Sequence, residues 1–182
     1  MDQDKLLQLA APLGVFAALT LAATPAFGQD TAQGSASSRV VEAVQIVNTA
    51  DLDFGQIIPN GTGVGRVIIN ASTGARTTNA NATLVGTSGF SRAEFTVTGD
   101  PRRFVIFTTA NPSITLTGPG ADMAVNRLRV NRNNGGQRSL PRRFRIPNSG
   151  SMNIGFGGRL IVGSTQAPGI YSGTFDLTVT YE

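Results

Sequence analysis

Gly169-Ile-Tyr-Ser-Gly-Thr-Phe-Asp-Leu-Thr-Val-Thr-Tyr-Glu182, the last fourteen residues of the sequence, is the stretch that decides the fold class. Its residues on one parity are Tyr171, Gly173, Phe175, Leu177, Val179 and Tyr181, and polar residues occupy the other parity. Successive side chains of a β-strand point to opposite faces, so the alternation predicts a strand with one apolar and one polar face. Such a strand needs a neighbour that pairs with its backbone donors and acceptors.

Other short apolar or alternating runs, separated by Gly, Pro, Asn and Asp, recur along the chain at the spacing of an all-β protein. We expect an immunoglobulin-like β-sandwich, with some of the runs joining into one strand. The glycine runs Gly61–Gly65 and Gly155–Gly158 are interpreted as hairpin or bulge loops. The predicted strands are Val40–Val47, Leu52–Ile57, Arg66–Asn70, Ala82–Val85, Glu94–Thr98, Phe104–Thr108, Ile114–Thr117, Met123–Val130, Phe144–Ile146, Ser151–Ile154, Leu160–Val162 and Thr174–Tyr181.

The N-terminal segment predicts export. Lys5 precedes a mostly apolar run over residues 6–23, and the small residues Ala26 and Gly28 stand at the spacing that a signal peptidase reads. We therefore expect a signal peptide over residues 1–28, an N-terminal extension over 29–39 and a sandwich domain over 40–182. The alternative is an uncleaved anchor helix, although no later segment is long and apolar enough to span a membrane. The expected location is the periplasm, the cell surface or an extracellular appendage.

The composition argues against an enzyme. The sequence has no Cys, which excludes disulfides and thiolate chemistry, and no His, which removes the commonest general base and transition-metal ligand. The carboxylates are scattered, and no Gly-x-Ser-x-Gly motif occurs. Asp51 and Asp53 share a predicted strand face but lack the further ligands of a calcium loop. We expect no catalytic activity, no bound metal and no cofactor.

A family resemblance rests on the C-terminal segment and on a wider pattern. Penultimate Tyr181, Gly169 fourteenth from the end and the alternation between them resemble the C-terminal motif of chaperone–usher pilins. Val40-Val-Glu-Ala-Val-Gln-Ile-Val47, Leu52-Asp-Phe-Gly55 and Gly157-Gly-Arg-Leu-Ile-Val-Gly163 resemble a family of secreted bacterial domains of unknown function, similar to spore-coat-U-like subunits. The resemblance covers about Val40 to Glu182.

This resemblance implies a mechanism of assembly. Pilins are similar to an immunoglobulin sandwich that lacks its last strand, and a strand from a periplasmic chaperone, then from the next subunit, fills the groove. By the resemblance, the partners would be copies of this chain or related subunits, a periplasmic chaperone and an outer-membrane usher. A penultimate residue has few intramolecular neighbours beyond its own sheet, so we expect Tyr181 to serve capture and assembly more than the fold. The residues it assigns to the groove are Gly169, Tyr171, Phe175, Leu177, Val179 and Tyr181.

The candidate donor strand departs from the family pattern. Residues 29–38 offer only Ala32, Gly34 and Ala36 on one parity, where a donor strand usually carries large apolar side chains. Burying Ala in place of Val or Leu forfeits on the order of 1 kcal/mol per pocket. Three alternatives follow: the pockets are shallow, Val40 and Val41 take part, or the domain completes its own sandwich.

Arginine suggests a second function. Removal of residues 1–28 would leave 14 basic and nine acidic residues, and every basic residue would be arginine. Residues 102–145 hold nine of these arginines against one acid, Asp122. Guanidinium groups bind phosphate and sulfate bidentately, so the alternative function is a monomeric envelope-surface domain that binds an acidic glycan, with no specific nucleic acid as partner. The candidate contacts are Arg127, Arg129, Arg142, Arg143 and Arg145, and the alternative is that these arginines form a solvated sheet face that keeps an edge soluble.

Overall fold

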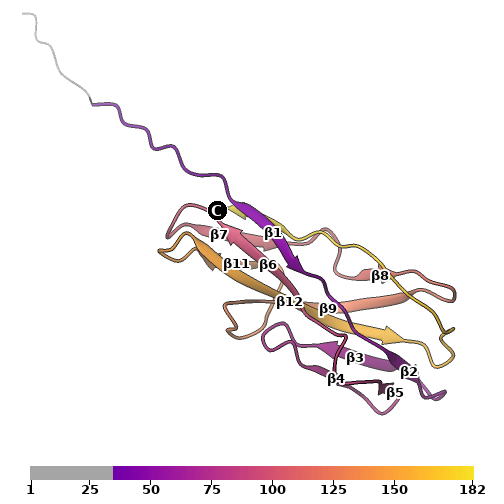
Figure 1. Cartoon of the computed structure of the whole chain (residues 1–182). Helices are drawn as coiled ribbons and strands as arrows, with labels where there is room; N and C mark the ends of the chain where they lie inside the picture. The colour runs from indigo at the N-terminus through magenta and orange to yellow at the C-terminus, as the bar shows by residue number, and fades with distance from the viewer. Residues whose placement is uncertain (1–34) are drawn as a thin grey trace, which may run out of the picture. The chain divides into compact units, whose positions relative to one another are not determined.

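The computed structural model describes residues 35–182, and the chain divides into two units, residues 1–38 and Arg39–Glu182. The second unit is built from β-strands that pack as a sandwich (Figure 1), which confirms the predicted all-β class. The predicted signal peptide and residues 29–34 of the predicted donor segment lie outside the described residues. Across residues 35–182 no helix is long and apolar enough to cross a membrane.

The strands form three antiparallel groups. The largest sheet has the order β1-β6-β12-β3-β4, with β9 on the other edge of β12 and β8 and β10 beside β9. Its strands are β1 (Gln45–Ala50), β3 (Gly65–Ile69), β4 (Arg76–Thr78), β6 (Ala93–Thr98), β8 (Ile114–Leu116), β9 (Met123–Arg132), β10 (Arg138–Ser139) and β12 (Ser151–Val162). The second sheet, in the order β11-β7-β13, contains β7 (Phe104–Thr108), β11 (Arg142–Arg145) and β13 (Thr178–Tyr181). The third group pairs β2 (Ile57–Pro59) with β5 (Ala82–Leu84).

The core lies between the two larger sheets. β12 supplies alternate buried side chains, including Ile154, Phe156 and Leu160, and β7 supplies the fully buried Val105 and Phe107. Burial of each such side chain stabilises the folded state by about 1.5–3 kcal/mol relative to leaving it exposed to water. This alternation is the strand period that the sequence displays, and it gives the sheet one apolar inner face and one outer face.

β12 is the central strand because three others pair with it. β6 pairs with residues 151–156 and β3 with residues 158–162 on the same edge, and β9 pairs along the other edge. Where the edge passes from β6 to β3, the backbone of Ile69 and Ala71 lies against the outer side of β12. A Cβ on Gly155 would come within 2.3 Å of the Ala71 oxygen, and one on Gly157 within 2.3 Å of the Ile69 oxygen.

The prediction of a loop at Gly155–Gly158 is therefore wrong. The two predicted strands Ser151–Ile154 and Leu160–Val162 are parts of one twelve-residue strand, and the glycines between them are strand residues. Glycine is required here because another segment of backbone approaches closely, which is one of the few reasons for glycine inside a strand.

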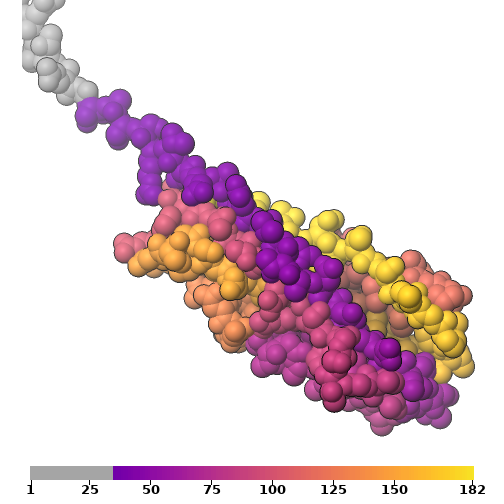
Figure 2. All heavy atoms as spheres, in the orientation of Figure 1, coloured from indigo at the N-terminus to yellow at the C-terminus, as the bar shows by residue number. Residues whose placement is uncertain are grey.

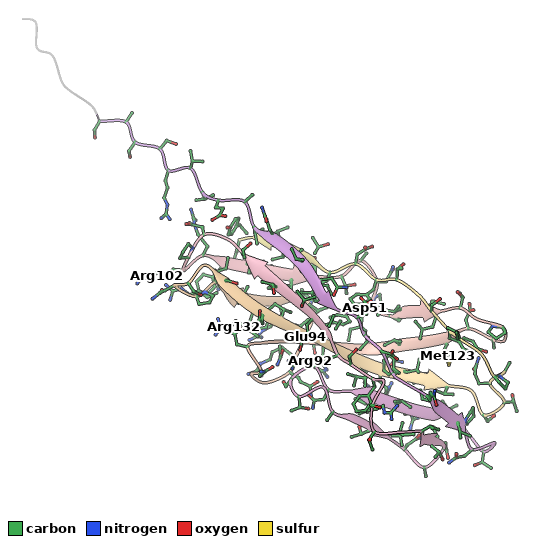
Figure 3. The ribbon with its side chains drawn as sticks, viewed as in Figure 1. Asp51, Arg92, Glu94, Arg102, Met123 and Arg132 are labelled. Atoms are coloured by element: carbon green, nitrogen blue, oxygen red, sulfur yellow. The ribbon has the colours of Figure 1, made fainter. Side chains whose placement is uncertain are left out.

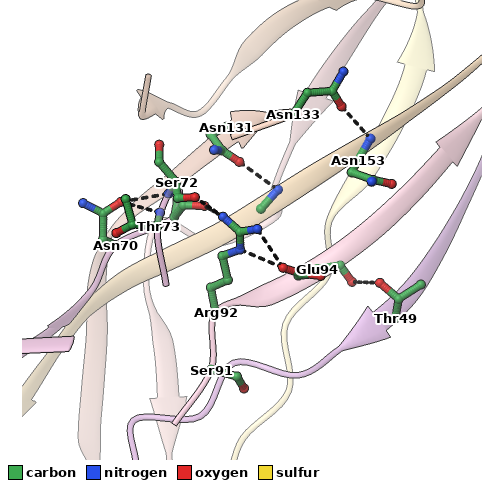
Figure 4. Close-up of polar contacts among 12 residues, drawn as sticks. Thr49, Asn70, Ser72, Thr73, Ser91, Arg92, Glu94, Asn131, Asn133 and Asn153 are labelled. Carbon is green, nitrogen blue, oxygen red and sulfur yellow. Dashed lines mark hydrogen bonds and ion pairs between the residues drawn. The ribbon is translucent and has the colours of Figure 1, made fainter. Parts of the chain in front are cut away.

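Polar side chains stabilise the place where the backbone of Ile69–Ala71 lies on β12, which we call the crossing (Figure 4). Buried Asn131 accepts a hydrogen bond from the Gly155 N–H at 3.0 Å, and its amide donates to the Gly135 oxygen at 3.2 Å. Arg92 donates to the oxygens of Ala71 and Ser72 and pairs with Glu94 at 2.8 Å. Buried polar groups are costly unless they are hydrogen-bonded, so these side chains allow the turn after β3 to lie on the sheet.

Several predicted strands are shorter or shifted. The predicted Leu52–Ile57 strand is interrupted at Gly55, which has φ +69° and donates its N–H to the Asp53 carboxylate at 2.7 Å. β1 begins at Gln45 rather than Val40, and β13 begins at Thr178 rather than Thr174. β4 and β10 were not predicted, because they are only three and two residues long and mostly polar or charged.

Gly157→Ala tests the crossing. The added methyl group meets backbone atoms of Ile69 and Ala71, which cannot move as a side chain can, so we expect a loss of about 1–3 kcal/mol in the free energy of unfolding. Urea denaturation measures the loss. Gly136→Ala is the control, because a Cβ there has nothing within 4 Å. Equal stability of the two variants would contradict the close packing of β3 on β12.

Candidate functional site

A groove of about 900 Å³ runs along one side of the sandwich. One rim is the segment Asp51–Pro59, which follows β1, and the other is residues 166–175, which precede β13. Figure 2 shows these segments as separate purple and yellow ridges on the same face of the domain. The floor is apolar and belongs to the core; its side chains are Ile114, Leu116, Met123, Val125, Leu160 and Val162.

Only part of each rim belongs to a strand ladder. On the first rim, Ile57–Pro59 is β2 and pairs with β5, whereas Asp51–Gln56 is held by the isolated bridge between Asp53 and Ser91 and by the bond from the Val85 N–H to the Gln56 oxygen. The other rim is held mainly by the isolated bridge between Thr117 and Ser172. Residues 173–177 belong to no strand ladder. Beyond the groove the rims converge, because β1 contacts β13. Extended backbone beside an apolar floor is the arrangement to which an added strand can bind.

The C-terminal segment keeps the predicted parity. From Tyr171 to Glu182 the side chains of the apolar parity are half-buried, except at Gly173, and those of the polar parity are exposed. Among the predicted groove residues, Gly169, Tyr171 and Phe175 line the groove. Phe175 stacks on buried Phe156 with 4.5 Å between ring centroids, and so covers part of the core beside the groove.

The other three predicted groove residues do not line it. Leu177, Val179 and Tyr181 pack against the core where β13 and β1 come together. The Tyr181 hydroxyl accepts the Asp100 N–H at 2.7 Å and donates to the Glu42 oxygen at 2.8 Å. The expectation that Tyr181 has few intramolecular neighbours is therefore wrong, because its hydroxyl ties the end of the chain to the segments before β1 and after β6.

Arg76 on β4 holds the other rim. Its guanidinium donates to the oxygens of Phe54 and Gln56 at 3.0 and 3.4 Å, and to those of Val85 and Gly86 at 3.1 and 2.7 Å. The same group lies 4.4 Å from the centroid of the Phe90 ring. Sequence reasoning missed this residue because its partners are backbone atoms, which leave no motif. Arg76 fixes the position of the groove rim around Gly55.

The predicted polyanion contacts lie in different surroundings. Alternation on β11 puts Arg143 and Arg145 on one face, and their guanidinium carbons lie 3.7 and 5.8 Å from the centroid of the Phe104 ring. The guanidinium carbon of Arg142 lies 5.9 Å from the centroid of the Phe144 ring. Arg143 also pairs with Glu182 at 2.5 Å.

On β9, Arg129 donates to the Ser139 hydroxyl. Arg127 lies near Arg159, whose pKa is lowered from its ordinary value by burial and by the positive charges of Arg127 and Arg66.

Two further arginines, Arg102 and Arg132, lie beside the β11 arginines Arg142, Arg143 and Arg145. Arg145 donates to the Arg102 oxygen at 3.0 Å, and Arg132 donates to the Arg145 oxygen at 2.7 Å. Arg102 and Arg132 lie at the same end of the sandwich (Figure 3). Backbone oxygens hold the side chains of Arg132 and Arg145, and the Asn148 amide oxygen holds that of Arg102 at 2.8 Å, so no carboxylate among the described residues neutralises these three charges.

The acidic pair considered for calcium has protein partners. The Asp51 carboxylate accepts from the Asn48 amide at 2.7 Å and the Asp53 carboxylate accepts from Gly55. In the part of the chain that the structure describes, no group of three or more His, Cys, Asp or Glu side chains is placed to hold a metal ion.

Comparison with known proteins gave one match. Residues 44–181 match the model of a family described as Domain of unknown function (DUF4402). No curated protein and no solved structure matches the chain.

Arg76→Met tests the role of Arg76. The substitution leaves the four carbonyl oxygens without their charged donor, so we expect a loss of about 1–3 kcal/mol in unfolding free energy. Hydrogen exchange should also accelerate at the Val85 N–H, which bonds to the Gln56 oxygen at 3.0 Å. Arg138→Met, at an exposed position on β10, should stay within about 0.5 kcal/mol of the wild type. Unchanged exchange at Val85 would show that the rim does not depend on Arg76.

Tyr181→Phe tests the hydroxyl bridge. Loss of the hydroxyl removes two hydrogen bonds and leaves the Asp100 N–H without this partner. We therefore expect the free energy of unfolding, measured by thermal or urea denaturation, to fall by about 1–3 kcal/mol. Tyr171→Phe is the matched control, since its hydroxyl makes a single bond to the Ala167 oxygen. A larger loss from the control would mean that the bridge does not secure the C-terminus.

Proposed function

The chain belongs to this family of unknown function, and from its groove we propose that it is a non-enzymatic structural subunit of a surface appendage or cell-surface layer, assembled by β-strand addition. The observation that carries the proposal is the apolar groove between two rims of which only part belongs to strand ladders. The resemblance of the C-terminal segment to chaperone–usher pilins supports the same function. A periplasmic chaperone and an outer-membrane usher are the partners that this route would use.

The groove has the chemistry that a strand requires. Its rims offer backbone groups to a new strand, and its floor offers contact to alternate side chains. Backbone hydrogen bonds would provide affinity, and the side chains that enter the groove would set the register. The floor side chains Leu116 and Met123 are only half-buried and pack against buried Val125 and Leu160, so an added strand would cover apolar surface that is continuous with the core.

We propose that the occupant is the N-terminal extension of a second copy. Phe175 already covers Phe156, so small side chains such as Ala32 and Ala36 suffice along that part of the groove. Val40 shares their parity and is 94% exposed, so it is free to take part. Each copy would then donate one strand and accept another, and this head-to-tail contact does not close, so it produces a filament.

Peptide addition tests the proposal. A synthetic peptide of residues 29–41, added at about 100 times its dissociation constant, should stabilise the mature chain, here residues 29–182 without the predicted signal peptide, by about 2.7 kcal/mol. For a domain of this size, that corresponds to a rise in melting temperature of about 5–10 °C. The measurement is thermal unfolding at increasing peptide concentration.

Two peptides of equal charge supply the control. Asp at positions 32, 36 and 40 places charge on the parity that enters the groove and should abolish the rise in melting temperature. Asp at positions 31, 35 and 37 falls on the opposite parity and should retain most of it. A mature chain that melts cooperatively at high temperature as a monomer, and that no peptide affects, would exclude assembly by strand addition.

A further inference from the structure

The outer face of the large sheet carries three arginines from three adjacent strands. Arg66 on β3 lies opposite Ile161 of β12, and Arg159 of β12 lies between Ile68 on β3 and Asn126 on β9. Arg66 and Arg159 are therefore diagonal neighbours on the sheet, about 7–8 Å apart and somewhat closer at their Cβ atoms. Arg127 follows Asn126 at an irregularity in the pairing of β9 with β12, where its side chain is exposed, and the positive charges of Arg127 and Arg66 both act on Arg159.

Within residues 35–182 no carboxylate forms an ion pair with these arginines. The four ion pairs among residues 35–182 involve Arg39, Arg92, Arg103 and Arg143, and none includes a member of the outer-face group. Arg159 donates its Nε–H to the Asn126 amide oxygen at 2.9 Å, which holds the guanidinium in place. Burial, Arg127 and Arg66 all lower the pKa of Arg159, as expected where like charges gather without an anion.

The backbone at Arg127 is strained in a way that places its side chain in this group. Between the pairs Gly157–Arg129 and Arg159–Asn126, β9 has one residue more than β12, which is a β-bulge. Arg127 has φ +51° at the bulge, in the left-handed region where glycine is the favoured residue. The bulge turns Leu128 into the core and leaves Arg127 exposed. Strain retained at such a position is a mark of a functional site.

We propose that the outer-face arginines Arg66, Arg127 and Arg159 bind a phosphate or sulfate group carried by a sugar. Guanidinium groups donate bidentately to both anions, and one anion placed between three of them relieves their mutual repulsion. Ile68, which is 42% exposed, and half-buried Ile161 lie between the arginines and offer an apolar surface to a sugar ring.

The surroundings favour a sugar over a single-stranded nucleic acid. Nucleic-acid binders of that kind stack bases on aromatic rings, and the outward side chains of β3 and β12 in this region are Arg and Ile. The site also differs from the groove, because the groove floor consists of inward residues such as Leu160 and Val162. The two sites lie on opposite faces of the same strands, so the anion site does not depend on the proposed assembly.

Titration with a sulfated disaccharide and with a sugar phosphate tests the proposal by calorimetry on the mature chain, with the uncharged disaccharide as a blank. Arg66→Gln and Arg159→Gln should each weaken binding of at least one charged sugar by about tenfold or more. Arg138→Gln removes one exposed charge elsewhere and should change affinity less than twofold. The better-bound sugar distinguishes sulfate from phosphate as the ligand group.

Arg127→Gly gives a signature that a structural role alone does not give. It should weaken binding by about tenfold or more, and should also raise the melting temperature by about 2–4 °C, because glycine relieves the left-handed strain. Equal weakening by Arg127→Gly and Arg138→Gln would mean adventitious attraction by net charge and would overturn the proposal. Tighter binding of a single-stranded oligonucleotide than of either sugar would also overturn it, as would the absence of binding to both.

Discussion

The contact of the Ile69–Ala71 backbone with Gly155 and Gly157 is the constraint on which the rest of the structure depends. β12 pairs with β6 and then with β3 along one edge, and this exchange is possible only where the chain that leaves β3 can lie on the strand. The crossing fixes where β3 ends, and β3 in turn pairs with β4, which carries Arg76. Arg76 then holds Phe54 and Gln56, so the rim of the groove is positioned from the centre of the sheet.

The strand period places the two proposed functions on opposite faces of this sheet. Inward residues of β9 and β12, such as Val125 and Leu160, form the core and the floor of the groove. The outward residue Arg159 belongs to the arginine group on the other face, together with Arg127 from the bulge in β9. A change at an outward position therefore leaves the groove floor intact, and binding of an anion does not compete with insertion of a strand.

The sequence predicts what depends on local period and misses what depends on distant contacts. The parity from Tyr171 to Tyr181 needs only alternation, and the structure confirms it. Gly155 and Gly157 were interpreted as loop residues, because glycines within a strand are explained only by the backbone that lies on them. Arg66 and Arg159 lie far apart in the sequence, so their meeting with Arg127 follows from strand order, which periodicity does not supply. The Tyr181 hydroxyl bridge is likewise invisible to sequence periodicity, because its partners are two backbone groups that lie far from Tyr181 in the sequence.

Each of the two proposed sites contains a departure from a local rule. Arg127 occupies a left-handed position that glycine would fill with less strain, and residues 173–177 leave backbone without a strand neighbour beside an apolar floor. Natural sequences usually agree with their fold at every level, and the exceptions concentrate where function requires them. An anion would offset the charge gathered around Arg127, and a strand from another copy would pair with the exposed rims. Both proposed partners therefore follow from the same kind of observation, a group on the described surface that lacks a partner of complementary chemistry.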